Sequence, residues 1–279
     1  MTMKASHPLP LVLAVLPQAA GDVAANLLGI TAACEKAATS SACMVVFPEM
    51  QLTGYLLGAD ALHQKALTLE EALFLLSPLA RKFDLCLVCG FAERTDAGFY
   101  VSALALGPEG LLAHYRKIHL GSPERGLYLE GDRPVVFSFM GLTFGLALCY
   151  DAHFPELFSC LAHMGAEVFL IPHASPRTTP EEKKASWLRH LPARAFDTGS
   201  YVLAVNPCSG DGTGKFFPGL ALALGPDGRA CAELFATGPG LLFLSLNPER
   251  VSAIRSHSMT AFHRGRRPDL YHGWMREEL

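Results

Sequence analysis

An internal repeat is the feature of this sequence that most constrains its fold. The segment ALALGPEG at 103–110 recurs as ALALGPDG at 221–228, and the segment VVFPE at 45–49 is echoed by FLIPH at 169–173. The two pairs follow the same order along the chain, so the sequence predicts two structurally related halves, each with a central strand that ends in Pro and a polar residue. If the halves pair, Glu49 and His173 lie at corresponding strand ends and face one crevice.

Each half is predicted to alternate strands and helices before ending in a hairpin. Apolar runs and helical periodicity give the first half the following elements: a strand at 10–16, a helix at 22–39, a strand at 44–49, a helix at 68–82, a strand at 85–91 and a hairpin of strands at 99–106 and 111–117. The second half follows with these: a helix at 155–164, a strand at 167–172, a helix from 179 that Pro192 kinks or restarts, a strand at 201–206, a hairpin at 217–224 and 230–235, and a last strand at 241–246. This pattern indicates an α/β protein.

Length and composition indicate one globular domain. The chain has 279 residues, half of them apolar, and a net charge of -3. Its Lys and Arg residues are scattered, and no apolar run approaches the roughly 20 residues of a membrane span, so we expect neither nucleic-acid nor membrane binding. We interpret residues 1–279 as a single domain with a C-terminal arm from about 248 to 279, where the composition shifts to charge, Pro and His.

The eight cysteines do not form a disulfide-scaffold pattern, and no secretory signal is evident, so we expect a cytoplasmic protein. Cys86 and Cys89 form a C-x-x-C pair within a predicted strand. Residues three apart in a strand face opposite sides of the sheet, which makes a disulfide between them, and a redox role, the weakest of the alternatives.

A single cysteine stands where a buried strand should end. The apolar run 141–148 is followed by Cys149 and then by a polar cluster, Tyr150-Asp-Ala-His153. In open sheets covered by helices, ligands are handled at the carboxyl ends of strands. A thiol at this position therefore indicates a nucleophile, although free cysteines are more often buried structural residues.

Three strand ends carry an acid, a lysine and a cysteine in the order Glu49, Lys117, Cys149. With the segments Ala193-Arg-Ala-Phe196, Val205-Asn206 and Arg266-Arg-Pro-Asp-Leu-Tyr271, this order and spacing resemble the nitrilase (carbon–nitrogen hydrolase) superfamily over nearly the whole chain. The resemblance implies a four-layer αββα sandwich of two pseudo-symmetric halves. It also implies a homodimer or larger assembly, with the C-terminal arm docked on the partner.

The resemblance implies cofactor-free hydrolysis of a non-peptide C–N bond in a small amide or N-carbamoyl compound, through a cysteine thioester. Cys149 would be the nucleophile, Glu49 the general base, and Lys117 the oxyanion donor together with the backbone N–H of Tyr150. Glu124 occupies the place of a second carboxylate that orients Lys117; the alternative for Glu124 is a loop carboxylate paired with Arg125. The product would be ammonia or an amine.

The substrate is less constrained. Nitrile-cleaving members typically carry Trp-Glu after the cysteine, so Tyr150-Asp151 favours an amidase. Relatives that act on carboxylate-bearing amides often have an Arg where this chain has Ala152-His153, which argues against a strict preference for such amides, although His153, His173 or Arg177 could serve an anion.

We expect Tyr55, Tyr150, His153 and His173 to contact substrate; for Tyr55 and His173 a structural role is an equal alternative. A nitrilase and a non-catalytic binding protein on the same fold are the alternative functions.

Two other patterns do not indicate cofactor sites. His153, His163 and His173 are evenly spaced but lack the spacing of metal ligands, so we expect no metal. The glycine-rich loop 209–215 departs from a phosphate-binding loop because Ser209 replaces its first glycine and Phe216 follows Lys215. We interpret it as a flexible loop.

Overall fold

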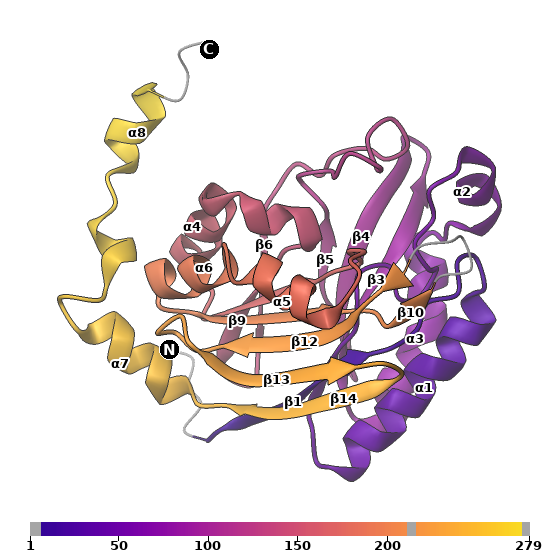
Figure 1. Cartoon of the computed structure of the whole chain (residues 1–279), viewed down its shortest axis with the longest axis horizontal. Helices are drawn as coiled ribbons and strands as arrows, with labels where there is room; N and C mark the ends of the chain where they lie inside the picture. The colour runs from indigo at the N-terminus through magenta and orange to yellow at the C-terminus, as the bar shows by residue number, and fades with distance from the viewer. Residues whose placement is uncertain (1–6, 211–215, 275–279) are drawn as a thin grey trace.

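Two six-stranded mixed sheets form the centre of the molecule (Figure 1). The computed structural model describes residues 7–210 and 216–274. The first sheet has the order β14 (Gly240–Leu246), β1 (Leu9–Val15), β2 (Met44–Val46), β3 (Cys86–Thr95), β4 (Gly98–Gly107) and β5 (Gly110–Arg116). The second has the order β13 (Ala230–Ala236), β12 (Gly219–Leu224), β9 (Tyr201–Asn206), β8 (Val168–Pro172), β7 (Leu142–Leu146) and β6 (Val135–Phe139).

The predicted pseudo-symmetry of the two halves is confirmed by the strand pairing. In the first sheet β1, β2 and β3 are parallel, and β4 and β5 continue antiparallel. In the second sheet β7, β8 and β9 are parallel, and β12 and β13 continue antiparallel. The repeated segments 103–110 and 221–228 therefore occupy equivalent hairpins, β4–β5 and β12–β13.

Helices cover the outer face of each sheet, which gives the predicted four layers. On the first sheet lie α1 (Val23–Thr39) and α3 (Leu69–Phe83), and on the second lie α4 (Pro155–His163), α5 (Pro180–Trp187) and α6 (Leu191–Thr198). Local sequence sets their starts: the side chain of Asp22 caps α1, Thr68 and Glu71 form a capping box on α3, and Thr179 caps α5. No helix of the described residues is both long and apolar enough to span a membrane.

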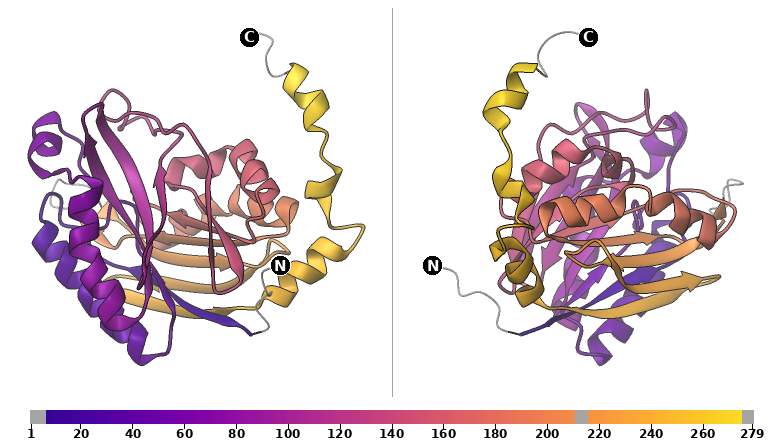
Figure 2. Two further views of the ribbon diagram at one scale, coloured as in Figure 1. Left: turned by 180° about the vertical axis from the view of Figure 1, so that it is seen from behind. Right: turned by 60° about the vertical axis from the view of Figure 1, so that its left-hand side comes forward.

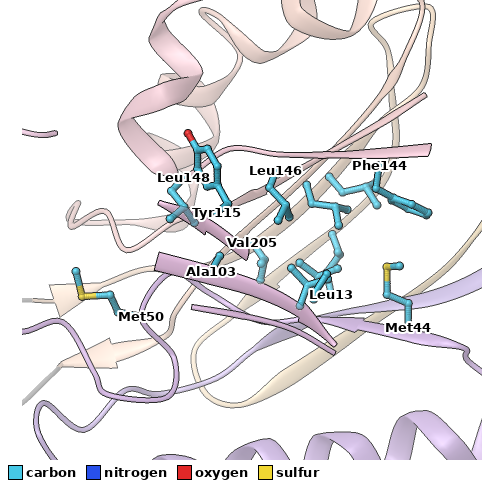
Figure 3. Packing of buried hydrophobic residues seen from close by; sticks show 14 of the residues in the cluster. Leu13, Met44, Met50, Ala103, Tyr115, Phe144, Leu146, Leu148 and Val205 are labelled. Atoms are coloured by element: carbon cyan, nitrogen blue, oxygen red, sulfur yellow. The ribbon is translucent and has the colours of Figure 1, made fainter. Parts of the chain in front are cut away.

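The largest hydrophobic core lies between the two sheets (Figure 3). Its fully buried members come from the facing sides of both sheets, including Leu13 and Val88 from the first, and Phe144 and Val205 from the second. Strands buried on both faces explain the continuous apolar runs in the sequence. Cys86 packs into this core while Cys89 packs under the helices, so the two cysteines face opposite sides of β3 as predicted.

Besides the short strands at the glycine-rich loop and the helices within 248–274, two elements were not predicted from the sequence. The short helix α2 (Ala59–Lys65) begins at Gly58 without a side-chain cap, and β6 lies at the edge of its sheet with a mostly half-buried pattern. Neither has a strong period or capping signal. In the glycine-rich loop, β10 (Ser209–Gly210) pairs with β11 (Phe216–Phe217); the remainder of that predicted loop, 211–215, lies outside the described residues.

The C-terminal segment first packs on the sandwich, where Val251 is fully buried, and only its last helix extends away (Figures 1 and 2). It contains α7 (Pro248–Ser256), a 3₁₀ turn at Phe262–Gly265 and α8 (Pro268–Trp274). Apolar side chains on it are exposed: Met259, Phe262, Leu270 and Tyr271. These exposed apolar residues fit the expected contact with a partner chain, and the homo-oligomer stays a prediction.

Gly90 on β3 supplies a testable constraint, because a Cβ added there would lie 2.5 Å from the backbone N of Met50 and 3.3 Å from the Cα of Glu49. Gly90→Ala must therefore displace the loop that carries Glu49, and we expect it to lower the free energy of unfolding by about 1–3 kcal/mol. Urea denaturation measures this loss. Gly238→Ala, where an added Cβ meets no atom within 4 Å, is the control; equal stability of the two variants would contradict the close approach.

Candidate active site

A buried lysine joins two buried carboxylates at the end of the first sheet. Lys117 follows the last residue of β5, and its Nζ donates to Oε1 of Glu49 at 2.8 Å and to both carboxylate oxygens of Glu124 at 2.8 Å. All three side chains are at most 1% exposed. A salt bridge this deeply buried is a weak argument for stability, which makes a functional role the better explanation.

Glu49 is fixed by the second half of the chain. Its Oε2 accepts the N–H of Ala174 at 2.9 Å, and its backbone N–H donates to the carbonyl of His173 at 3.1 Å. The side chain of Gln18 donates to the carbonyl of Glu49 at 2.6 Å. The strand ends that the repeat paired, 45–49 and 169–173, therefore do meet.

Glu124 is held by a tyrosine and by its own loop. The hydroxyl of Tyr55 donates to Oε1 of Glu124 at 2.9 Å, and the N–H of Gly121 donates to Oε2 at 2.7 Å. The alternative pairing with Arg125 does not occur, because the Arg125 guanidinium donates instead to the carbonyl of Leu120. Tyr55, predicted to contact substrate, is buried and orients the second carboxylate.

Cys149 stands on a strained turn. It begins a 3₁₀ turn, Cys149–His153, three residues after the end of β7, and its φ is +43°, in the left-handed region that side-chain-bearing residues rarely adopt. Such a conformation costs of order 1–3 kcal/mol and persists when the surroundings impose it. The residue as a whole is half-buried, unlike the fully buried Cys34, Cys86 and Cys89.

Asp151 joins the cysteine turn to the lysine segment. Its Oδ2 accepts the Leu148 N–H at 2.9 Å and the Tyr115 hydroxyl at 2.7 Å. Its Oδ1 accepts the backbone N–H of His119 at 2.9 Å and lies 2.8 Å from Nδ1 of that ring. The donors immediately precede Cys149 and flank Lys117 by two residues on each side. One buried carboxylate thus sets the position of both segments.

The electrostatics of the site favour base-assisted attack. Burial, with a contribution from the charge of Glu49, raises the pKa of the Cys149 thiol to about 12, and Lys117 only partly opposes this. Burial and the charge of Glu124 raise the pKa of Glu49 to about 7 against the attraction of Lys117. Burial disfavours the ammonium of Lys117, but the surrounding negative charges outweigh it, so its pKa is raised and it stays protonated.

The other predicted contact residues lie around the cysteine turn. The Tyr150 ring is 5.3 Å from that of His153, which is exposed and lies 4.4 Å from the ring of His190. His173 is fully buried: its Nδ1 lies 2.8 Å from the carbonyl of Ile171, and burial lowers its pKa well below the ordinary value. A neutral ring of this kind packs and hydrogen-bonds in the core rather than binding an anion.

Lys183 and Trp187, whose ring lies 4.6 Å from that of His173, were not predicted from the sequence. Both lie on the buried face of α5, and their spacing of four is the signal that could have placed them on one side of a helix. From the sequence, Asp151 indicated only the amidase type and not a link between the two segments. Its partners Tyr115 and His119 each lie two residues from Lys117. This alternate spacing in an extended chain is the signal that could have placed the three side chains on one side.

The arrangement can support acyl transfer. It contains a half-buried thiol, a carboxylate whose pKa lies near neutrality and a fixed ammonium, which are the groups needed to attack a carbonyl and stabilise the resulting oxyanion. Within the described part of the chain, no three His, Cys, Asp or Glu side chains are grouped to hold a metal ion.

Comparisons with known proteins agree with this chemistry. Residues 13–256 match the family model described as carbon-nitrogen hydrolase. The chain is 33% identical over 217 residues to an (R)-stereoselective amidase of a Pseudomonas species, covering 76% of each chain. It is 30% identical over 205 residues to a deaminated glutathione amidase of a Synechocystis species, covering 68% of this chain and 74% of that one.

Solved structures of amidases are similar to this chain over nearly its whole length. An amidase from a Nesterenkonia species has a TM-score of 0.83 and 26% identity, with 98% of each chain covered. In a variant of a Nesterenkonia amidase, also with a TM-score of 0.83 and 26% identity, covering 98% of this chain and 99% of that one, the acetamide moiety of fluoroacetamide is covalently added at the active-site cysteine.

Asp151→Asn tests the link between the two segments. In Asp151→Asn an NH₂ group replaces one of the two carboxylate oxygens. It would then point at a backbone donor, the N–H of Leu148 or the N–H of His119, and one buried hydrogen bond would be lost. We expect the free energy of unfolding to fall by about 1–3 kcal/mol. Urea denaturation measures the effect, with Tyr115→Phe as the milder comparison because it removes one donor and leaves the carboxylate. An Asp151→Asn variant as stable as the parent would contradict the link.

Proposed function

Because this chain belongs to the carbon–nitrogen hydrolase family, we propose that it is an amidase that hydrolyses a small amide or N-carbamoyl compound through a thioester on Cys149. The observation that carries the proposal is the Lys117 ammonium, which is hydrogen-bonded to both Glu49 and Glu124 in a segment that Asp151 ties to the turn carrying Cys149. The amidases among its relatives support the reaction class.

In the first step Glu49 accepts the thiol proton while the sulfur of Cys149 attacks the amide carbon. Because burial raises the pKa of the Cys149 thiol far above neutrality, the reaction needs a base positioned at the sulfur. Electrons of the C=O bond move to the oxygen. The Lys117 ammonium and the backbone N–H of Tyr150 would stabilise this oxyanion.

In the second step the oxyanion collapses and the C–N bond breaks. Glu49 returns its proton to the departing nitrogen, so ammonia or an amine leaves and a thioester remains on Cys149. Glu49 then takes a proton from water, whose oxygen attacks the thioester carbon, and collapse releases the acid and restores the thiol. A carboxylate with a pKa near 7 suits both directions of proton transfer.

Glu124 acts as a positioning residue in this proposal. Both of its oxygens hold the Lys117 ammonium, and Tyr55 and Gly121 hold Glu124 in turn. The ammonium is therefore fixed before substrate binds, which is the condition under which an oxyanion donor is most effective.

Substitution of the three central residues tests the mechanism. Release of ammonia from short amides should disappear in Cys149→Ala and fall at least about 100-fold in Glu49→Gln and Lys117→Met, since a base and an oxyanion donor each contribute about that factor or more. Cys160→Ala, at an exposed cysteine on α4, is the matched control. Nitriles assayed in parallel test the alternative of a nitrilase.

Two outcomes would contradict the proposal. Equal ammonia release by the Cys149→Ala and unsubstituted proteins would remove Cys149 as nucleophile. A protein that turns over nitriles but no amide would be a nitrilase. Mass spectrometry of the trapped acyl-enzyme identifies the acyl group, and fluoroacetamide should label Cys149 but not the Cys149→Ala variant.

The pH dependence tests the role of Glu49 as base. Glu49 is active when deprotonated, and its pKa is raised to about 7 mainly by burial. We therefore expect kcat/KM to rise as pH increases through about 7 and to level off above it, because this ratio reports ionisations of the free enzyme. An acidic limb near pH 4 instead would show that the base is an unperturbed carboxylate and would contradict the assignment.

A further inference from the structure

Lys183 is a buried cation without a counterion among the described residues. It lies on α5, is only 3% exposed, and its Nζ is 5.1 Å from the centre of the Trp187 ring. No carboxylate of the described residues forms an ion pair with it. Its neighbour Lys184, in contrast, lies 2.6 Å from Oε2 of Glu233 at the surface.

A chain of contacts places Lys183 beside the catalytic residues. The Trp187 ring lies 4.6 Å from the ring of His173. The carbonyl of His173 accepts the backbone N–H of Glu49, and the next residue, Ala174, holds the Glu49 carboxylate. The charge of Lys183 lowers the pKa of the Cys149 thiol, and the charge of Cys149 raises the pKa of Lys183, although burial outweighs both effects.

Further basic side chains gather around the 3₁₀ turn Cys149–His153. Arg194 donates from Nε to the carbonyl of Ala152 at 3.1 Å, and the rings of His153 and His190 lie 4.4 Å apart. Burial first, and then the charge of Arg177, lowers the pKa of Lys183 to about 8 despite attraction from Cys149 and Glu49. Burial and the neighbouring cations likewise lower the pKa of His190 to about 4.

Glu49 does not neutralise Lys183. Its Oε1 accepts from the Lys117 ammonium and its Oε2 accepts from the N–H of Ala174, both at hydrogen-bond distance. A buried charge without a partner is costly, and an anion that reaches it recovers that cost. The site is therefore electrostatically prepared for a negative group that the described residues do not supply.

We propose that Lys183 determines substrate specificity by binding a carboxylate carried by the acyl part of the amide substrate, within a few bonds of the scissile carbonyl. This inference rests on the proposed amidase function. It also revises the sequence-based argument against carboxylate-bearing amides: the segment Ala152-His153 lacks an Arg, but α5 supplies a buried cation from elsewhere in the chain.

The role of Lys183 is one of recognition. The substrate carboxylate forms an ion pair with the ammonium and undergoes no bond change, while the C–N bond is broken at Cys149 as described above. A charge-assisted pair in a water-poor site is stronger than one at the surface. The pair would also orient the scissile carbonyl toward the sulfur.

Paired substrates test the proposal. The monoamide of succinic acid and the primary amide butanamide share a four-carbon chain and differ in a terminal carboxylate. We expect the unsubstituted protein to have the higher kcat/KM for the acidic amide, and we expect Lys183→Met to lower the ratio of the two values at least about 30-fold, as loss of one partner of a buried charge pair does. Lys183→Arg should restore part of the ratio, and Lys184→Met should leave it unchanged.

A preference for the neutral amide in the unsubstituted protein would overturn the inference. So would an equal fall in both rates in Lys183→Met, because that result would assign Lys183 to the thiol or the oxyanion instead.

A binding measurement separates this inference from the proposed function. Calorimetry with succinate on the Cys149→Ala variant requires no turnover, and adding Lys183→Met should weaken the affinity at least about 10-fold. Equal succinate affinity with and without Lys183 would overturn the inference even if the protein is an amidase. Lys183-dependent binding in a protein that hydrolyses no amide would overturn the proposed function and leave the anion site standing.

Discussion

The contact on which the site depends is the Lys117 ammonium shared by Glu49 and Glu124 in a place that water barely reaches. Burial and the charge of Glu124 disfavour the ionised form of Glu49, so the pKa of Glu49 lies near neutrality. The neighbouring negative charges raise the pKa of Lys117, which remains protonated. The remaining features of the site follow from supporting this contact: a tyrosine and a loop amide for one carboxylate, and a backbone amide from the other sheet for the second.

The duplicated fold explains how such distant residues meet. Each half contributes a central parallel strand, β2 or β8, and the polar residues after these strands lie side by side where the sheets face each other. The large apolar core between the sheets holds the two strand ends in register (Figure 3). Asp151 adds a direct link between the cysteine turn and the lysine segment. The reactive groups thus lie just beyond strand ends, on short segments that these contacts hold in place.

Much of this could be predicted from the sequence. Apolar periodicity gave the order of strands and helices, the repeat indicated two halves, and strand-end polar residues indicated Glu49, Lys117 and Cys149. Sequence patterns did not predict α2 and β6, where periodicity and capping signals are weak. They also did not predict the role of a side chain that depends on a partner distant in the sequence. The bond from Tyr55 to Glu124 joins residues 69 positions apart and could not be read from the sequence, and its contact with substrate stays a prediction. The burial of the His173 ring, which lowers its pKa well below the ordinary value, likewise depends on its tertiary neighbours, and its contact with substrate stays a prediction.

The sequence by itself determined which residues stand at the strand ends, because strand and helix patterns are local properties of the chain. Only the tertiary structure decided which of them share charge and how deeply each is buried. Glu49 and Lys117 are 68 positions apart, and Lys183 packs on Trp187, whose ring contacts that of His173, from a helix whose own sequence does not show which end of the sheet it covers. Desolvation and Coulomb interactions depend on distance and burial in space, and packing of the two sheets sets both.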